Sequence, residues 1–105
     1  MKKFSNLIVQ HSNNGIARIK LNNPNTYNAL STEMLNALIN NFKNLNKDTK
    51  TKVIIIEGMG KGFSSGHDLN EIRSLKKKSK YNKLFNLCSK LMLIIVEGKK
   101  PVIAK

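Results

Sequence analysis

The side chains best suited to chemistry lie in one glycine-rich run of the chain. Ser64 and Ser65 carry hydroxyl groups, and His67 and Asp68 follow them closely. A nucleophile, a base and an acid can perform acid–base or nucleophilic catalysis when they face one another. Adjacent residues on a turn usually point in different directions, which weakens His67 and Asp68 as a base with its orienting acid.

Four glycines between residues 58 and 66 indicate tight bends, or a close approach of the backbone to another group. The known nucleotide-binding patterns do not fit this run. In a phosphate-binding loop a Gly-Lys pair is followed by Ser or Thr, whereas Lys61 is followed by Gly62. The dinucleotide fingerprint would place its third glycine where Phe63 stands.

Three interpretations of the run remain open. Gly62 to Gly66 spells the G-x-S-x-G of a nucleophile elbow, but no downstream acid and histidine remain to complete a triad. A backbone role needs no side chain, because a strand that ends in a glycine-rich turn can point N–H groups into a cleft. Such groups stabilise a carbonyl oxygen that gains negative charge. A purely structural tight turn is the alternative.

The elements that position this run follow from hydrophobic periodicity. Residues 5–11 and 15–21 predict two strands, and the Asn-Gly pair between them is a strong hairpin signal. Ser31 or Thr32 is expected to cap a helix. Its apolar side chains recur at helical spacing: Met34, Leu35, Leu38, Ile39, Phe42 and Leu45.

The second half of the chain alternates strand and helix. Residues 53–56 are continuously apolar and β-branched, which is typical of a strand covered on both faces. Asp68 or Asn70 is expected to begin a short helix, and a longer helix is predicted over 80–97. Residues 101–104 predict a strand interrupted at the terminus, which implies a truncated protein or a partner that completes the sheet. The order indicates one α/β domain with a partly parallel sheet.

The charge of the chain is strongly positive. Nineteen basic residues against six acidic ones give a net charge of +13, which suggests a polyanionic partner. All but Arg18 and Arg73 are lysines, and they are scattered, so a general bias towards Lys and Asn explains the charge equally well. The cluster at 76–80 fits a solvated loop or a contact with a phosphorylated ligand. Without interleaved aromatic residues, we expect no nucleic-acid binding.

Other classes are excluded by simple counts. No apolar run approaches the ~18 residues of a membrane span, so no membrane partner is expected. The N-terminus lacks the apolar segment of a signal peptide, which predicts a cytoplasmic protein that is mature from its first residue. Two well-separated histidines give no metal-site spacing. Cys88 cannot form an internal disulfide, and its apolar neighbours favour a core residue over a reactive thiol.

Four segments carry a family resemblance in their order and spacing. They are Ile16–Asn22 with Pro24, Tyr27–Ser31, Val53–Gly58 leading into Gly62–Leu69, and Lys100–Ala104. Together they resemble the N-terminal part of the crotonase (enoyl-CoA hydratase/isomerase) family, over essentially all 105 residues. The residue sequence of the third segment is most similar to that of the enoyl-CoA hydratase domain-containing members of the family. A similar Gly-His-Asp occurs in methylmalonyl-CoA decarboxylase-like members.

The resemblance implies a fold and a ligand. The fold is a crotonase-like spiral of repeated ββα units, of which residues 1–105 would be the N-terminal portion, truncated after the strand that begins at Pro101. Family members usually assemble as trimers or paired trimers. The ligand is an acyl-CoA thioester in fatty acid metabolism, with coenzyme A as part of the substrate and no separate cofactor.

The resemblance also implies a site. The backbone N–H of His67 would be the first donor of an oxyanion hole for the thioester oxygen. Where some hydratases carry a CoA-contacting lysine, this chain has Asn70. The full set expected to contact the substrate is Ala29, Leu30, Ser64, Ser65, Gly66, His67 and Asp68.

The family's remaining machinery is not matched. Its second oxyanion donor and its proton-transferring acids lie beyond the strand that begins at Lys100. None of the six acidic residues of this chain stands at the corresponding positions. We therefore expect a half-site that binds the ligand but is inactive alone. A non-catalytic interaction module, or half of a split acyl-CoA enzyme, is the alternative.

Overall fold

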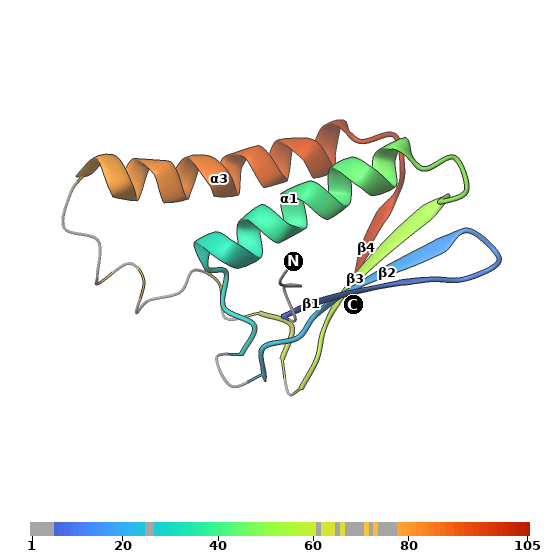
Figure 1. Ribbon diagram of the computed structural model, residues 1–105, viewed down its shortest axis with the longest axis horizontal. Helices are drawn as coiled ribbons and strands as arrows, with labels where there is room; N and C mark the ends of the chain where they lie inside the picture. The colour runs from blue at the N-terminus through green and yellow to red at the C-terminus, as the bar shows by residue number, and fades with distance from the viewer. Residues whose placement is uncertain are drawn as a thin grey trace, which may run out of the picture.

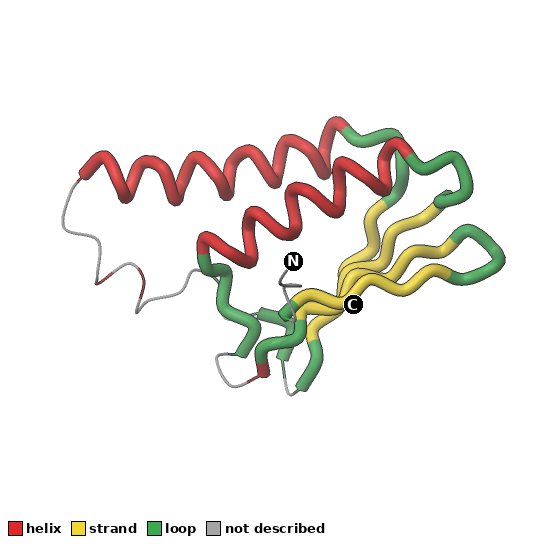
Figure 2. The backbone as a smooth tube through the Cα atoms, viewed as in Figure 1, coloured by secondary structure: helices red, strands yellow, loops and turns green. Residues whose placement is uncertain are grey.

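Two helices lie against the same face of a four-stranded sheet (Figures 1 and 2). The computed structural model describes residues 6–24, 27–60, 62–64, 66, 71, 73 and 78–105. The strands are β1 (Leu7–His11), β2 (Ile16–Leu21), β3 (Val53–Gly58) and β4 (Val102–Ala104), and the helices are α1 (Thr32–Lys47) and α3 (Lys78–Glu97).

The sheet is mixed, as the sequence predicts. Its strand order is β1-β2-β3-β4. β1 pairs with β2 in antiparallel fashion, with Val9 opposite Ile19, whereas β2 with β3 and β3 with β4 pair in parallel. Gly15 takes a φ of +87° in the hairpin turn, a left-handed conformation that glycine adopts without steric cost. The predicted hairpin and the α/β class are confirmed.

Side chains form hydrogen bonds with backbone groups at both ends of helix α1. Ser31 is the N-cap, and its Oγ accepts a hydrogen bond from the backbone N–H of Met34 at 3.1 Å. At the other end, the Lys100 ammonium group donates to the carbonyl oxygens of Leu45 and Asp48. A cation there complements the negative end of the helix dipole. Because Lys100 lies two residues before β4 begins, this contact ties the last strand to the first helix.

The core lies between the two helices and the inner face of the sheet. β2 alternates strictly, with Ala17, Ile19 and Leu21 buried and the residues between them half-exposed. The buried stripe of α1 is the predicted one: Met34, Leu35, Leu38, Ile39, Phe42 and Leu45. From α3, Leu84 and Leu91 are buried, and Cys88 is half-buried against this core. The interpretation of Cys88 as a core residue is therefore confirmed.

β3 differs from the sequence prediction on one face. Ile54 is fully buried beneath the helices, but Ile55, which points the opposite way, is only half-buried. Among the described residues no helix covers that outer face. It carries Glu57, whose carboxylate lies 3.7 Å from Arg18 and 3.9 Å from Lys20 of β2. The predicted start of the short helix, at Asp68 or Asn70, lies outside the described residues.

Candidate functional site

The side chain of Asn28 joins two loops at the carboxyl end of β3. It is 0% exposed, and its Nδ2 lies 3.0 Å from the carbonyl oxygen of Met59, 3.1 Å from that of Gly62 and 3.0 Å from that of Phe63. A carboxamide has two N–H donors, so these three carbonyls share them. The Asn28 amide therefore determines the path of the glycine-rich loop.

Asn28 is itself fixed by its own loop. Its backbone N–H donates to the Asn23 carbonyl at 2.8 Å, and its Oδ1 accepts from the Asn23 N–H at 2.7 Å. Its φ is 55°, a left-handed conformation in which asparagine is among the best-tolerated non-glycine residues. Both ends of the carboxamide are thus satisfied, as a buried polar group requires.

Ser64 makes the second link between the loops. Its hydroxyl donates to the Asn28 carbonyl at 2.8 Å and accepts from the Gly66 N–H at 3.1 Å. The Gly66 carbonyl in turn accepts from the Leu30 N–H at 2.6 Å. The hydroxyl of Ser64 is therefore engaged in holding backbone groups, which disfavours the nucleophile-elbow interpretation of the G-x-S-x-G pattern.

Gly58 is required where the loop folds back on the strand. A Cβ atom at this position would lie 2.3 Å from the Phe63 carbonyl oxygen and 2.6 Å from that of Gly62. Contacts this short cannot be relieved by side-chain motion, because the atoms are backbone. Gly66 has a φ of +89°, which also favours glycine. Gly60 likewise has a φ of +90°, so three of the four glycines of the run have a steric reason.

Glu71 lies at the start of α1. Its Oε1 accepts from the Thr32 backbone N–H at 3.0 Å and from the Thr32 hydroxyl at 2.6 Å. A carboxylate at a helix N-terminus satisfies one of the unpaired N–H groups and complements the dipole. This contact draws the segment after the glycine loop towards the N-terminus of α1, beside the Ser31 cap.

The structure brings together the predicted site residues that it describes. Ala29 is buried and Leu30 is half-buried. Leu30 bonds to Gly66, and Asn28, which precedes Ala29, bonds to Ser64. Ser65, His67 and Asp68 lie outside the described residues, as do Lys76 and Lys77 of the lysine cluster at 76–80. In the described part of the chain, no group of three or more His, Cys, Asp or Glu could hold a metal ion.

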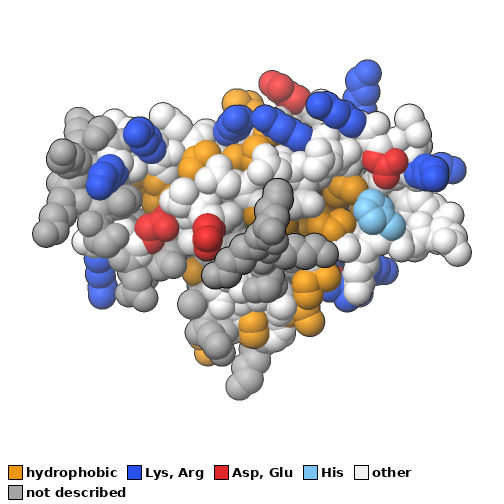
Figure 3. Space-filling model, in the orientation of Figure 1, with side chains coloured by type: hydrophobic (Ala, Val, Ile, Leu, Met, Phe, Trp, Pro, Cys, Tyr) orange, Lys and Arg blue, Asp and Glu red, His pale blue; other side chains and the backbone are white. Residues whose placement is uncertain are grey.

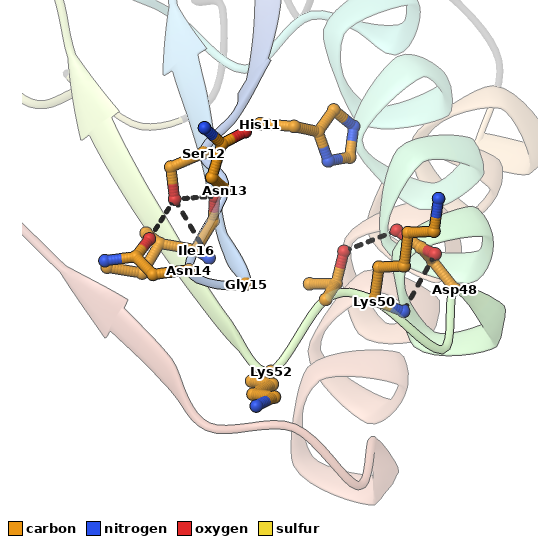
Figure 4. Close-up of a pocket in the computed structure, with 10 residues that line it drawn as sticks. His11, Ser12, Asn13, Asn14, Gly15, Ile16, Asp48, Lys50 and Lys52 are labelled. Atoms are coloured by element: carbon orange, nitrogen blue, oxygen red, sulfur yellow. Dashed lines mark hydrogen bonds between the residues drawn. The ribbon is translucent and has the colours of Figure 1, made fainter.

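A separate hollow opens at the other end of the sheet, where β2 and β3 begin (Figure 4). It measures about 650 Å³ and lies between the hairpin turn, 11–16, and the loop after α1, 48–52. In it the Thr51 hydroxyl donates to Asp48, and this bond, with the Lys50 backbone N–H, lowers the pKa of Asp48 below its usual 3.8. No pattern in the sequence indicates this hollow.

The arrangement at the glycine loop is that of a backbone-built site at the carboxyl end of a parallel strand. Comparison with known proteins agrees, because residues 11–105 match the family described as enoyl-CoA hydratase/isomerase. The chain belongs to this family. The resemblance seen in the four sequence segments is thereby confirmed.

Curated relatives match nearly the whole chain. The enoyl-CoA hydratase domain-containing protein 3, mitochondrial, of Danio rerio is 42% identical over 100 residues, which cover 95% of this chain and 35% of the relative. The human protein of that name is 41% identical over 86% of this chain and 30% of its own length. Human ethylmalonyl-CoA decarboxylase is 40% identical over 64% of this chain. The chain thus spans about a third of the length of the relatives in the first group.

Solved structures confirm the predicted crotonase-like fold. An enoyl-CoA hydratase from Mycobacterium smegmatis superposes with a TM-score of 0.91 at 37% identity, covering 94% of this chain and 38% of the other. Human enoyl-CoA hydratase domain-containing protein 3 gives a TM-score of 0.87 at 36% identity, covering 94% of this chain and 39% of the other. The described strands and helices of this enoyl-CoA hydratase/isomerase family chain therefore have the same arrangement as the matched parts of those structures.

Two residues of the site have roles that sequence analysis did not assign. Asn28 appeared only as part of a family segment, although asparagine in a loop is a known candidate for a left-handed conformation. Glu71 lies in the segment of the expected short helix, for which no contact was predicted. Both act through contacts with residues more than 30 positions away, which no local pattern indicates.

Proposed function

We propose that this chain binds an acyl-CoA thioester of fatty acid metabolism at the junction of the two loops. The backbone N–H of His67 donates to the thioester oxygen. Ser65 and Asp68 contact the ligand on one side of the junction, and Ala29 and Leu30 border coenzyme A through their backbones. Ser64 and Gly66 complete the set. The scattered lysines add a favourable field for the anionic coenzyme A phosphates.

The observation that carries this proposal is the double link between the loops. The Asn28 amide holds three carbonyl groups of the glycine loop, and the Ser64 hydroxyl bonds to the backbone of both loops, at Asn28 and at Gly66. An oxyanion site needs backbone donors that are fixed before the ligand arrives. The junction lies at the carboxyl end of β3, where ligands bind in open α/β sheets.

We further propose that these 105 residues do not turn over an acyl-CoA by themselves. Of the acidic side chains, Glu57 lies on the outer face of the sheet beside Arg18, and Glu71 is engaged with Thr32. Asp48 is at the opposite end of the strands, in the hollow where β2 and β3 begin. Proton transfer requires a group within hydrogen-bond reach of the reacting atom. The proposal is supported by the position of Glu57 and Asp48 away from the junction and by the bonds that Glu71 already makes to Thr32.

Calorimetric titration of the chain with butyryl-CoA, and separately with free coenzyme A, tests the proposal. We expect saturable binding of one butyryl-CoA per chain, with weaker binding of free coenzyme A because the thioester oxygen is absent. Equal affinities would show that the thioester is not recognised. With crotonyl-CoA, we expect no loss of the conjugated absorbance above the rate without protein, and a clear loss would contradict the half-site.

The cytoplasmic location and the trimeric or hexameric assembly stay predictions. The relatives named as mitochondrial do not test the first. Neither described helix is long and apolar enough to cross a membrane. The alternative function, an interaction module or half of a split enzyme, is favoured by the uncovered apolar surfaces of α3 and the sheet.

A further inference from the structure

The turn between β1 and β2 holds Asn14, the one asparagine of the sequence that is followed by glycine. Its side chain is exposed and lines the hollow where β2 and β3 begin (Figure 4). Figure 3 shows charged side chains of both signs and a histidine at the surface at the right-hand end of the view, where Figure 1 places this hairpin turn. Water and hydroxide therefore reach the Asn14 carboxamide.

The backbone of Gly15 is held firmly at its carbonyl group and weakly at its nitrogen. The carbonyl oxygen accepts from the Lys52 N–H at 2.7 Å and from the Val53 N–H at 3.2 Å. The N–H donates to the Ser12 carbonyl at 3.4 Å, which is beyond the usual length of such a bond. Glycine has no Cβ that would obstruct an approach to its nitrogen. A rotation of the Asn14 backbone that opens this one weak bond can bring the nitrogen to the Asn14 carboxamide.

The oxygen of the Asn14 carboxamide already has a hydrogen-bond donor. The Ser12 hydroxyl donates to Asn14 Oδ1, and it shares its one proton with the Ile16 carbonyl, 3.1 Å away. The Ile16 N–H in turn donates to the Ser12 hydroxyl at 3.2 Å, which fixes the hydroxyl in the turn. A fixed donor at a carbonyl oxygen stabilises the negative charge that develops there when a nucleophile attacks the carbon. Ser12 is therefore placed to assist an attack on the Asn14 carboxamide.

We propose that Asn14 is a site of self-modification, at which the chain converts this asparagine to aspartate and isoaspartate with the assistance of the Ser12 hydroxyl. Hydroxide removes the proton of the Gly15 N–H, and the nitrogen attacks Cγ of Asn14. The new C–N bond closes a succinimide ring, and the negative charge that develops on Oδ1 faces the Ser12 hydroxyl. The bond from Cγ to Nδ2 then breaks, and Nδ2 takes a proton from water and leaves as ammonia. A water molecule opens the ring at one of its two carbonyls, which gives aspartate or isoaspartate.

The two products change the hairpin in different ways. Aspartate places a negative charge in a hollow that Lys50 and Lys52 also line, so it gives these cations an attractive partner. Isoaspartate also adds a methylene group to the backbone before Gly15. Because the Gly15 carbonyl is bonded to the start of β3, we expect this extra length to disturb the pairing of the turn with β3. The hollow lies at the opposite end of the strands from the acyl-CoA junction, so this proposal and that one can fail separately.

Peptide mapping by mass spectrometry, after the folded chain has aged in mildly alkaline buffer, tests the proposal. Digestion in acid, with a sample that was not aged, measures the conversion caused by handling. We expect Asn14 to convert faster than every other asparagine and to give two products of equal mass that chromatography separates. Asn14→Gln is the matched control, because its longer side chain must close a larger and less favoured ring, and it should stay intact. Conversion of Asn14 no faster than that of the other asparagines would overturn the proposal.

Variants of Ser12 test the assistance by its hydroxyl. In the folded chain, Ser12→Ala should slow the conversion of Asn14 roughly fivefold, which is the contribution of one ordinary hydrogen bond. Ser12→Thr keeps a hydroxyl and should convert at the rate of the original chain. In concentrated urea all three chains should convert at the same rate, because the turn that holds the hydroxyl beside Oδ1 is lost. A rate in folded Ser12→Ala that equals or exceeds that of the original chain would overturn the role of Ser12.

Discussion

The side-chain amide of Asn28 lies 3.0 Å from the carbonyl oxygen of Phe63, which is 35 positions further along the chain. This bond joins the loop before α1 to the loop after β3. The same nitrogen reaches two more carbonyls of the second loop, so one buried side chain sets the geometry of the whole candidate site.

Asn28→Asp tests this role with almost no change of shape. A carboxylate has no N–H donors, and it would face three carbonyl oxygens in a buried position. We expect the free energy of unfolding to fall by about 3 kcal/mol or more, because a buried charge loses its partners. Urea denaturation followed by circular dichroism measures it. Asn44→Asp, at an exposed position of α1, is the matched control and should change stability little.

Gly58 and Gly62 make a second matched pair. Gly58→Ala would force a Cβ to within 2.3 Å of the Phe63 carbonyl, and we expect a loss of about 1–3 kcal/mol from overpacking. Gly62→Ala meets nothing within 4 Å and should stay within about 0.5 kcal/mol of the original chain. Thermal or urea unfolding separates them, and equal losses would mean that the loop does not fold back on β3.

Ser64→Ala removes the hydroxyl that links Asn28 and Gly66. We expect a stability loss of about 1 kcal/mol, typical of a single hydrogen bond, and a larger relative loss of butyryl-CoA affinity. Ser64→Thr, which keeps the hydroxyl, should restore affinity. Ser89→Ala changes an exposed serine of α3 and serves as the control. An unchanged dissociation constant in Ser64→Ala would remove Ser64 from the site.

The lowered pKa of Asp48 predicts that the stability of the fold depends on pH. The Thr51 hydroxyl and the Lys50 N–H lower its pKa in the folded chain below the value of 3.8 that it has when unfolded. A carboxylate with a lowered pKa stabilises the fold above pH 3.8, and this stabilisation is lost as the pH falls through the folded pKa. Denaturation measured between pH 6 and pH 2 should therefore show a smaller acid-induced loss in Thr51→Val, whose side chain cannot donate to Asp48.

The elements of the fold are largely readable from local sequence. The Asn-Gly turn before Ile16 and the serine before Thr32 have mechanisms that act within a few residues, so hairpin and helix cap were both predictable. The hydrogen bonds of the Asn28 side chain to the glycine loop were not predictable, because a side chain that bonds to distant carbonyls leaves no periodic pattern in the sequence. The need for glycine at position 58 likewise depends on a loop that returns to it only in three dimensions.

The burial of β3 shows that an apolar sequence pattern alone does not determine which faces of a strand are covered. Its continuous run predicted cover on both faces, and the structure covers Ile54 but leaves Ile55 half-buried. The pattern reports how much apolar surface must be buried, but it does not say which polypeptide buries it.

The most direct test of the central claim is an amide-resolved NMR titration of the chain with butyryl-CoA. The account predicts a saturable downfield shift of the His67 amide proton, with smaller changes at Ala29, Leu30 and Gly66. Free coenzyme A should leave the His67 amide unchanged. If butyryl-CoA instead shifts amides around Lys50 and Lys52, or moves His67 no more than free coenzyme A does, the proposed oxyanion donor is wrong.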